Sequence, residues 1–126
     1  MQKNPVVFWE LASSDLEASV EFFREVFEWQ IDFSDRLGFY LIPESGVEGV
    51  NIDGAIFQLR KAKLPFLTVF IQVEDIIEKA RQVEEHGGFI LEEPQKISSG
   101  AHICLFNEPS GVTFAMIEPN RENDEK

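Results

Sequence analysis

Two stretches of the chain, Val6-Val-Phe-Trp-Glu-Leu-Ala-Ser-Ser-Asp15 and Phe66-Leu-Thr-Val-Phe-Ile-Gln-Val-Glu-Asp75, match when one is shifted by sixty residues. Each is an apolar, strand-like run that ends at an acidic residue, and a helical pattern follows it. The match extends over the segments Val7–Phe33 and Leu67–Glu93, and within it Trp29 corresponds to Phe89. The sequence therefore consists of two similar halves.

The segment after each acidic residue predicts a helix with one apolar face. Ser14 with Glu17, and Asp75 with Glu78, predict a capping box at the two helix starts. The helical spacing also predicts that the aromatic side chains of the first half pack in the core rather than contact a ligand. The apolar positions of the two helices are Leu16, Val20, Phe23, Phe27, Ile76, Ala80 and Val83, and the aromatic set is Phe22, Phe23, Phe27 and Trp29.

Three short strand candidates follow each helix, and residues typical of turns separate them. The candidates are Trp29–Phe33, Leu37–Ile42, Ala55–Arg60, Phe89–Glu92, Ala101–Phe106 and Val112–Ile117. The sequence thus predicts a βαβββ module twice, at about residues 5–60 and 66–118, in a single domain of residues 1–119. Lys61–Pro65 is the expected linker, and residues 120–126 form a polar tail.

The composition limits the classes of partner. The 126 residues carry a net charge of −12, which argues against nucleic acid and anionic membranes because phosphate contacts need clustered Lys and Arg. No apolar run approaches the 18 or so residues of a membrane span, and the start of the chain is unlike a signal peptide. Cys104 is the only cysteine, so an internal disulfide is excluded. We therefore expect a cytoplasmic protein.

The ordered motifs of the two halves resemble those of the vicinal-oxygen-chelate superfamily, the glyoxalase/bleomycin resistance/dioxygenase-like domains. The resemblance rests on Leu11-Ala-Ser-Ser-Asp15 running into Phe22-Phe-Arg-Glu-Val-Phe-Glu-Trp29, and on Val73-Glu-Asp75 leading to Glu85-His-Gly-Gly88. Gly100–Gly111 is similar to the family's closing strand and turn. The resemblance implies an α+β fold in which two βαβββ modules form a curved eight-stranded mixed sheet around a cleft, with the helices outside. It also implies a homodimer.

The family's divalent metal is usually held by four side chains, two on the first strands and two on the last strands of the modules. Carried over to this sequence, those positions fall at Phe8, Thr68, Gln58 and Ala115. Phe and Ala have no donor atom, and one neutral amide does not hold an ion. We therefore expect no metal and no cofactor, and no metal-dependent glyoxalase or dioxygenase chemistry.

Strand alternation predicts which side chains face the cleft. In the first, fourth, fifth and eighth strands a mixed row of polar and apolar residues lies opposite an aliphatic row. We assign Ile56, Gln58 and Arg60 to the mixed row of the fourth strand. The predicted ligand-binding residues, with one added from the seventh strand, are Phe8, Glu10, Gln58, Arg60, Thr68, Phe70, His102, Thr113 and Ala115.

Four of these residues have competing interpretations. Glu10 is either a cleft carboxylate with a raised pKa that acts as a base, or a carboxylate paired with a cation or exposed to solvent. Arg60 clamps an anionic group, neutralises Glu10 or lies on the surface. Gln58 donates and accepts in the cleft or is a sheet-edge residue, and His102 is a ligand contact or an ordinary strand histidine.

Two functions remain open at the level of sequence. The first is a metal-free protein that binds a small, partly apolar molecule in its cleft. The alternative is a lyase or isomerase in which Glu10 is the general base and Arg60 or Gln58 stabilises negative charge. The loop Pro43–Asp53 is long enough to be a lid over either site.

Overall fold

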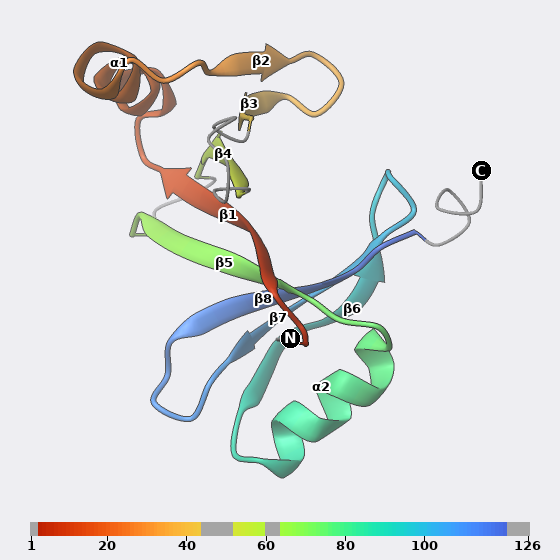
Figure 1. The fold of residues 1–126 in the computed structure, drawn as a ribbon. Coiled ribbons are helices and arrows are strands. Elements are labelled where there is room, and N and C mark those ends of the chain that lie inside the picture. Colours follow the sequence, from red (N-terminus) through yellow and green to blue (C-terminus); the bar gives the residue numbers. More distant parts are fainter. Residues whose placement is uncertain (1–2, 44–51, 60–63, 121–126) are drawn as a thin grey trace. The chain divides into compact units, whose positions relative to one another are not determined.

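The computed structural model describes residues 3–43, 52–59 and 64–120 and divides into two compact units (Figure 1). The units are Val7–Thr68, which we call the first module, and Val69–Lys126 together with Met1–Val6, which we call the second. The strand Phe66–Gln72 spans this boundary and is counted with the second module. Each module contains a helix and strands in the order βαβββ, which confirms the α+β class and the tandem repeat. No helix in the described ranges is long and apolar enough to cross a membrane.

The elements follow the predicted order, with small changes at their ends. Those of the first half are β1 (Val6–Ser13), α1 (Leu16–Phe27), β2 (Asp32–Ser34), β3 (Phe39–Ile42) and β4 (Asp53–Gln58). Those of the second half are β5 (Phe66–Gln72), α2 (Ile76–Glu85), β6 (Phe89–Lys96), β7 (His102–Asn107) and β8 (Thr113–Glu118). The predicted lid, apart from its ends at Pro43, Ile52 and Asp53, lies outside the described residues, as does most of the predicted linker.

Each module pairs its first strand with its last strand in parallel. The first module has the strand order β2-β3-β4-β1, and the second has β5-β8-β7-β6. A parallel pair needs a crossover connection, and the helix with two antiparallel strands supplies it here. The two registers correspond, because Glu10 is paired with Ala55 and Phe70 with Ala115. The sixty-residue shift therefore holds for strand pairing as well as for sequence.

An aspartate caps each helix. The Asp15 side chain accepts from the N–H of Ala18 at 3.2 Å, and the Asp75 side chain accepts from the N–H of Glu78 at 3.1 Å. Asp75 is the N-cap residue of α2, at the predicted position. The cap of α1 is one residue later than predicted, because Asp15 and not Ser14 is the N-cap residue. Both carboxylates satisfy helix N–H groups that have no partner inside the helix.

The end of each last strand also contacts the start of the helix in its own module. Gln58 accepts a hydrogen bond from the N–H of Leu16, and Glu118 accepts one from the N–H of Ile76, each at 2.9 Å. Both pairs are 42 residues apart in sequence, so they are equivalent in the repeat. We call these two contacts the helix-start links. They connect the helix N-terminus to the strand that completes the module.

Each helix covers one face of its module's sheet and buries an apolar core there. The buried residues of the first core are Val20, Ile31, Ile42 and Ile56, with Trp9, Leu11, Leu16, Phe23 and Tyr40 against them. Those of the second core are Val73, Ile76, Ala80, Ile90, Cys104, Phe106 and Met116. The prediction that the aromatic set packs inside holds for Phe23. It is wrong for Phe22, Phe27 and Trp29, which are 53%, 55% and 37% exposed.

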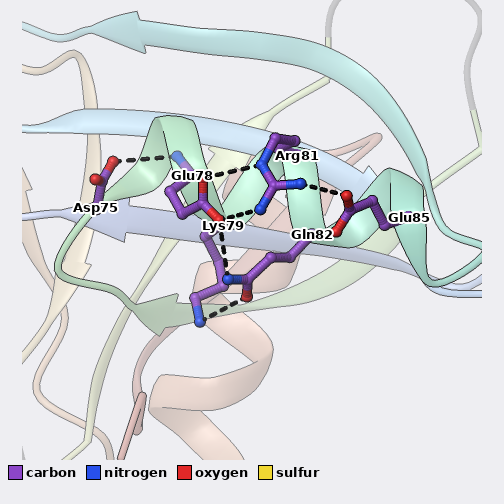
Figure 2. Close-up of polar contacts among 6 residues, drawn as sticks. All are labelled: Asp75, Glu78, Lys79, Arg81, Gln82 and Glu85. Carbon is purple, nitrogen blue, oxygen red and sulfur yellow. Dashed lines mark hydrogen bonds and ion pairs between the residues drawn. The ribbon is translucent and has the colours of Figure 1, made fainter.

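The solvent side of α2 carries a network of charged side chains (Figure 2). Arg81 forms ion pairs with Glu78 and Glu85, one turn before and one turn after it. Gln82 donates to Glu78, and Lys79 donates to Gln82, each at 3.2 Å. The Arg81 hydrogen bonds lower the pKa of Glu78 to about 2. This network is a solvated helix face, which is a structural role.

Candidate functional site

The face of each sheet away from its helix contains most of the predicted site residues. In β1, Trp9 and Leu11 pack against the core beneath α1, so alternation places Phe8 and Glu10 on the opposite face. In β5, Ile71 packs against the core beneath α2, which places Phe70 opposite. We call these surfaces the helix-distal faces, and the predicted parity of β1 and β5 agrees with them.

The predicted parity of β4 is wrong. Ile56 is fully buried in the core beneath α1, and the side chain of Gln58 reaches the N-terminus of that helix. The helix-distal row of β4 is therefore Asp53, Ala55 and Phe57. The polar character of Gln58 and Arg60 favours a cleft position for that row, whereas the structure buries Ile56 of the same row in the core beneath α1. The repeat carried the correct signal, because a shift of sixty residues relates Ala55 to Ala115.

Gln58 uses its whole side-chain amide in the first helix-start link. Its oxygen accepts from the N–H of Leu16 at 2.9 Å, and its nitrogen donates to the carbonyls of Ser14 and Leu59 at 3.0 and 3.3 Å. These bonds satisfy an acceptor and both donors of the amide. Gln58 thus has a capping role in this structure, and Arg60 lies outside the described residues.

Glu10 lies among apolar neighbours on the helix-distal face of the first module. Phe8 and Ala12 flank it along β1, and its cross-strand partner Ala55 is 0% exposed. Glu10 itself is half-buried, and no ion pair within the described residues includes it. Burial raises the pKa of Glu10 from 4.5 to about 7, because an apolar environment disfavours the charged carboxylate. Glu10 therefore exchanges its proton near neutral pH.

The helix-distal face of the second module carries the repeat-related row. Phe70 is 6% exposed, and its strand partner Ala115 is completely buried. Thr113, two residues before Ala115, donates its hydroxyl hydrogen to the side-chain oxygen of Asn107 at 2.7 Å. Thr68 precedes Phe70 by two residues on the same row of β5 and is 4% exposed. The face therefore consists of apolar and hydroxyl side chains that are mostly buried, with a phenyl ring where the first module has Glu10.

His102 lies on the other side of the second module's sheet. It shares a row with Cys104 and Phe106, which pack beneath α2, and its strand partner on β8 is Glu118. The structure therefore does not bring His102 together with Phe70, Thr113 and Ala115. Sequence reasoning could have found this separation, because Cys104 and Phe106 continue the apolar alternation that begins at His102.

Cys104 has the properties of a core thiol. It is 1% exposed, and burial, together with the charges of Glu93 and Glu92, raises its pKa to about 11. A thiol with a raised pKa is a poor nucleophile at neutral pH. The prediction that Cys104 is a small core residue is confirmed.

The described residues form no group of three or more His, Cys, Asp or Glu side chains that is suited to a metal ion. Two cavities lie elsewhere than the predicted site. One, of about 500 Å³, lies in the second module and is lined by Lys3, Asn4, Pro5, Gln72, Val73, Glu74, Asp75, Glu78 and Lys79. The other, of about 390 Å³, lies in the first module and is lined by Trp9, Glu28, Trp29, Gln30, Ile42, Pro43 and Ile52. Sequence reasoning missed both.

The sequence matches a family model over residues 5–116, which is most of the chain. The model describes the Glyoxalase/Bleomycin resistance protein/Dioxygenase superfamily. A comparison with curated proteins finds no significant match.

Several solved structures share the fold at low sequence identity. Methylmalonyl-CoA epimerase of Streptomyces coelicolor, in complex with 2-nitronate-propionyl-CoA, is 16% identical, with a TM-score of 0.62 over 94% of this chain and 96% of that one. The Mycobacterium tuberculosis epimerase is 14% identical, with a TM-score of 0.62 over 96% and 91%. A structure described as NAD-dependent benzaldehyde dehydrogenase of Legionella pneumophila is 12% identical, with a TM-score of 0.63 over 89% and 97%. At these identities the likeness establishes the fold and no activity.

Proposed function

Because the chain belongs to the Glyoxalase/Bleomycin resistance protein/Dioxygenase superfamily, we propose that it binds a small, partly apolar molecule on a helix-distal face. In the first module the binding residues are Phe8, Glu10 and Ala55, with Glu10 as the polar anchor. In the second module the repeat-related residues Phe70, Thr113 and Ala115, with Thr68 beside them in β5, complete the proposed set of contact residues. Gln58 and His102 are not part of the proposal, since their side chains lie on the helix side of the sheets.

The observation that carries the proposal is the position of Glu10. A carboxylate in an apolar row is unfavourable for folding unless it is paired or protonated, and no described cation pairs with Glu10. Such a residue with a perturbed pKa is a candidate for function. The methyl group of Ala55 opposite Glu10 leaves more room beside the carboxyl group than a larger side chain would.

The chemistry of Glu10 defines the kind of ligand. With a pKa of about 7, Glu10 donates a hydrogen bond when protonated and accepts one when ionised. The neighbouring Phe8 and Ala12 offer apolar contact to the rest of the molecule. A planar or partly apolar compound with one carbonyl or hydroxyl group fits these requirements.

A divalent metal does not fit the residues at the family's ligand positions. Phe8 and Ala115 have no donor atom, Thr68 has a neutral hydroxyl, and the amide of Gln58 is bonded at the start of α1. Divalent ions in proteins are held by several carboxylate, imidazole or thiolate groups. A divalent metal therefore has no part in the proposed function.

A second candidate function is proton transfer by a lyase or isomerase, with Glu10 as the general base. The pKa of about 7 favours it, because a general base is most effective when its pKa lies near the working pH. Several proteins with this fold are named epimerases, a class of isomerase. The Gln58 amide is hydrogen-bonded at the start of α1. Among the described residues we therefore assign none to the stabilisation of negative charge on a reacting substrate.

The binding proposal is tested with a library of small, neutral carbonyl and hydroxyl compounds, screened by ligand-observed NMR at pH 6 and pH 8. We expect hits whose dissociation constants rise about tenfold in Glu10→Gln and Phe8→Ala, a loss of about 1.4 kcal/mol. The matched control is Glu25→Gln, an exposed carboxylate of α1. Hits that bind wild type, Glu10→Gln and Phe8→Ala equally well would contradict the site.

The enzyme alternative has a separate test. The protein is incubated in D₂O with methylmalonyl-CoA and with simple α-substituted ketones, and exchange of the proton next to the carbonyl is followed by NMR. Exchange that wild type accelerates and Glu10→Gln does not supports the base role. Equal exchange with both proteins removes the alternative and leaves the binding proposal in place.

We also propose a homodimer in the cytoplasm, on the family resemblance. Large apolar side chains on α1, among them Phe22, Val26 and Phe27, are more than half exposed, and burying them in a protein interface would be favourable. Sedimentation equilibrium over a range of protein concentrations distinguishes a dimer from a monomer of 14.4 kDa.

A further inference from the structure

The cavity of about 390 Å³ in the first module is a separate feature from the helix-distal face. Trp9 belongs to the row of β1 that packs toward α1, whereas Glu10 points to the opposite side of the strand. The cavity lies where β1 and the segment after α1 meet the end of β3. Its volume is within the range of small-molecule sites. It is lined by Trp9, Glu28, Trp29, Gln30, Ile42, Pro43 and Ile52.

Two indole rings form the aromatic wall of this cavity. The rings of Trp9 and Trp29 have centroids 5.9 Å apart and planes inclined by 53°, and Phe23 stacks on Trp29 at 4.7 Å. Trp9 lies directly over Gly54, where an added Cβ atom would approach the ring to 2.1 Å. The Gly54 backbone thus holds the Trp9 indole in place, and the Phe23 ring holds the Trp29 indole.

Glu28 lines the same cavity from a backbone position that favours glycine. It is the C-cap residue of α1, with φ of 56° and ψ of 34°, in the left-handed region. The C-cap residue of α2, His86, has a φ of −104° and lies outside this region. Glycine adopts this left-handed conformation without steric penalty, whereas glutamate adopts it at a steric cost. A strained residue that lines a cavity points to a role for its side chain.

The combination of two tryptophans with a carboxylate is not a requirement of the βαβββ fold. A shift of sixty residues relates Trp9 to Val69, Trp29 to Phe89 and Glu28 to Gly88. The second module therefore reaches the same topology with one aromatic ring and no acid at these positions. The topology alone therefore does not call for this set, although Trp9 also packs against the core of the first module.

We propose that the Trp9–Trp29 cavity binds a small organic cation, such as a quaternary or protonated amine. Indole faces attract cations more strongly than other aromatic rings, and methylated ammonium groups are bound in this way by aromatic cages. The Glu28 carboxylate adds a charge of the opposite sign, and the net charge of −12 raises the local concentration of cations. Ile42, Pro43 and Ile52 offer the apolar contacts that alkyl groups need.

The chain offers a direct spectroscopic test, because Trp9 and Trp29 are its only tryptophans. Their two indole N–H resonances and the tryptophan fluorescence, excited selectively over that of Tyr40, report on this cavity. The probes are choline and its neutral isostere 3,3-dimethyl-1-butanol, titrated at constant ionic strength. We expect choline to shift both indole resonances and to bind at least about tenfold more tightly than the alcohol.

Variants locate the binding site. Glu28→Gln keeps the size of the side chain and removes its charge, and we expect it to weaken choline binding severalfold. Trp29→Leu should abolish the fluorescence response of the remaining indole to choline. Glu25→Gln, which removes an equal charge from α1 outside the cavity, should leave the affinity unchanged.

Three results would overturn the proposal. They are indole resonances that do not move with choline, equal binding of choline and the neutral alcohol, and equal losses in Glu28→Gln and Glu25→Gln. The last result would assign the attraction to net charge rather than to the cavity. Folding of each variant is checked independently by its amide NMR spectrum, so a loss of structure is not mistaken for a loss of binding.

Discussion

At the scale of single residues, the protonation of Glu10 has a measurable effect on the free energy of unfolding. Its pKa is 4.5 in an exposed reference state and about 7 in the fold. Folding therefore favours the protonated form: the contribution of Glu10 is fully present below pH 4.5 and is lost as pH rises to about 7. The difference corresponds to about 3 kcal/mol.

We therefore predict that Glu10→Gln reduces the loss of stability between pH 5 and pH 8. Wild type and variant should unfold in urea with similar free energies at pH 5, and the variant should be more stable at pH 8 by up to about 3 kcal/mol. Glu25→Gln is the control for a change in net charge. A variant that follows the wild-type pH dependence would mean that Glu10 is ionised in the fold at neutral pH.

Single residues were also the hardest features to predict from sequence. The raised pKa of Glu10 was foreseen as one of two alternatives, because a lone acid in an apolar strand indicates burial. The left-handed conformation of Glu28 was not foreseen, since glycine normally occupies that position and the sequence has none there. Nor did the sequence reveal the role of Gln58, whose partner Leu16 lies 42 residues away.

At the scale of elements, the helix-start links are the contacts most open to test. Gln58→Ala and Glu118→Ala each leave a helix N–H without its partner, and we predict a loss of about 1 kcal/mol in the free energy of unfolding for each. Gln95→Ala, on an exposed position of β6, should change it by less than about 0.5 kcal/mol. The measurement is urea unfolding followed by circular dichroism. Equal effects in all three variants would mean that the links add nothing to stability.

The order of helices and strands was predictable, and the orientation of one strand was not. Helical spacing and turn residues located α1, α2 and all the later strands, because these signals are local. The prediction of which face of β4 lies against the helix is wrong. Ile56 and Phe57 are both apolar and lie on opposite faces of the strand, so alternation alone does not identify the buried face. The segment from Trp29 to Ile31 was predicted as strand, but Trp29 instead stacks on Phe23 after the end of α1. Only tertiary packing decides such positions.

The whole molecule carries a large negative charge, which has a consequence for stability. With a net charge of −12, the folded chain repels itself, and salt screens this repulsion over a Debye length of about 10 Å at 0.1 M. We predict that the melting temperature rises by a few degrees between 0.02 and 0.5 M NaCl. Differential scanning calorimetry measures it, with a glycerol series as a control for solvent effects. A melting temperature that falls with salt would mean that attractive ion pairs, such as those of Arg81, outweigh the repulsion.

The helix-start links also bear on how fast the chain folds. Each link joins residues 42 apart in sequence, and closing a long loop has an entropic penalty that local contacts avoid. We therefore expect the first turn of each helix to be fixed late in folding, although its capping aspartate lies next to it in sequence. On this account a module that lacks its last strand has an incompletely fixed helix.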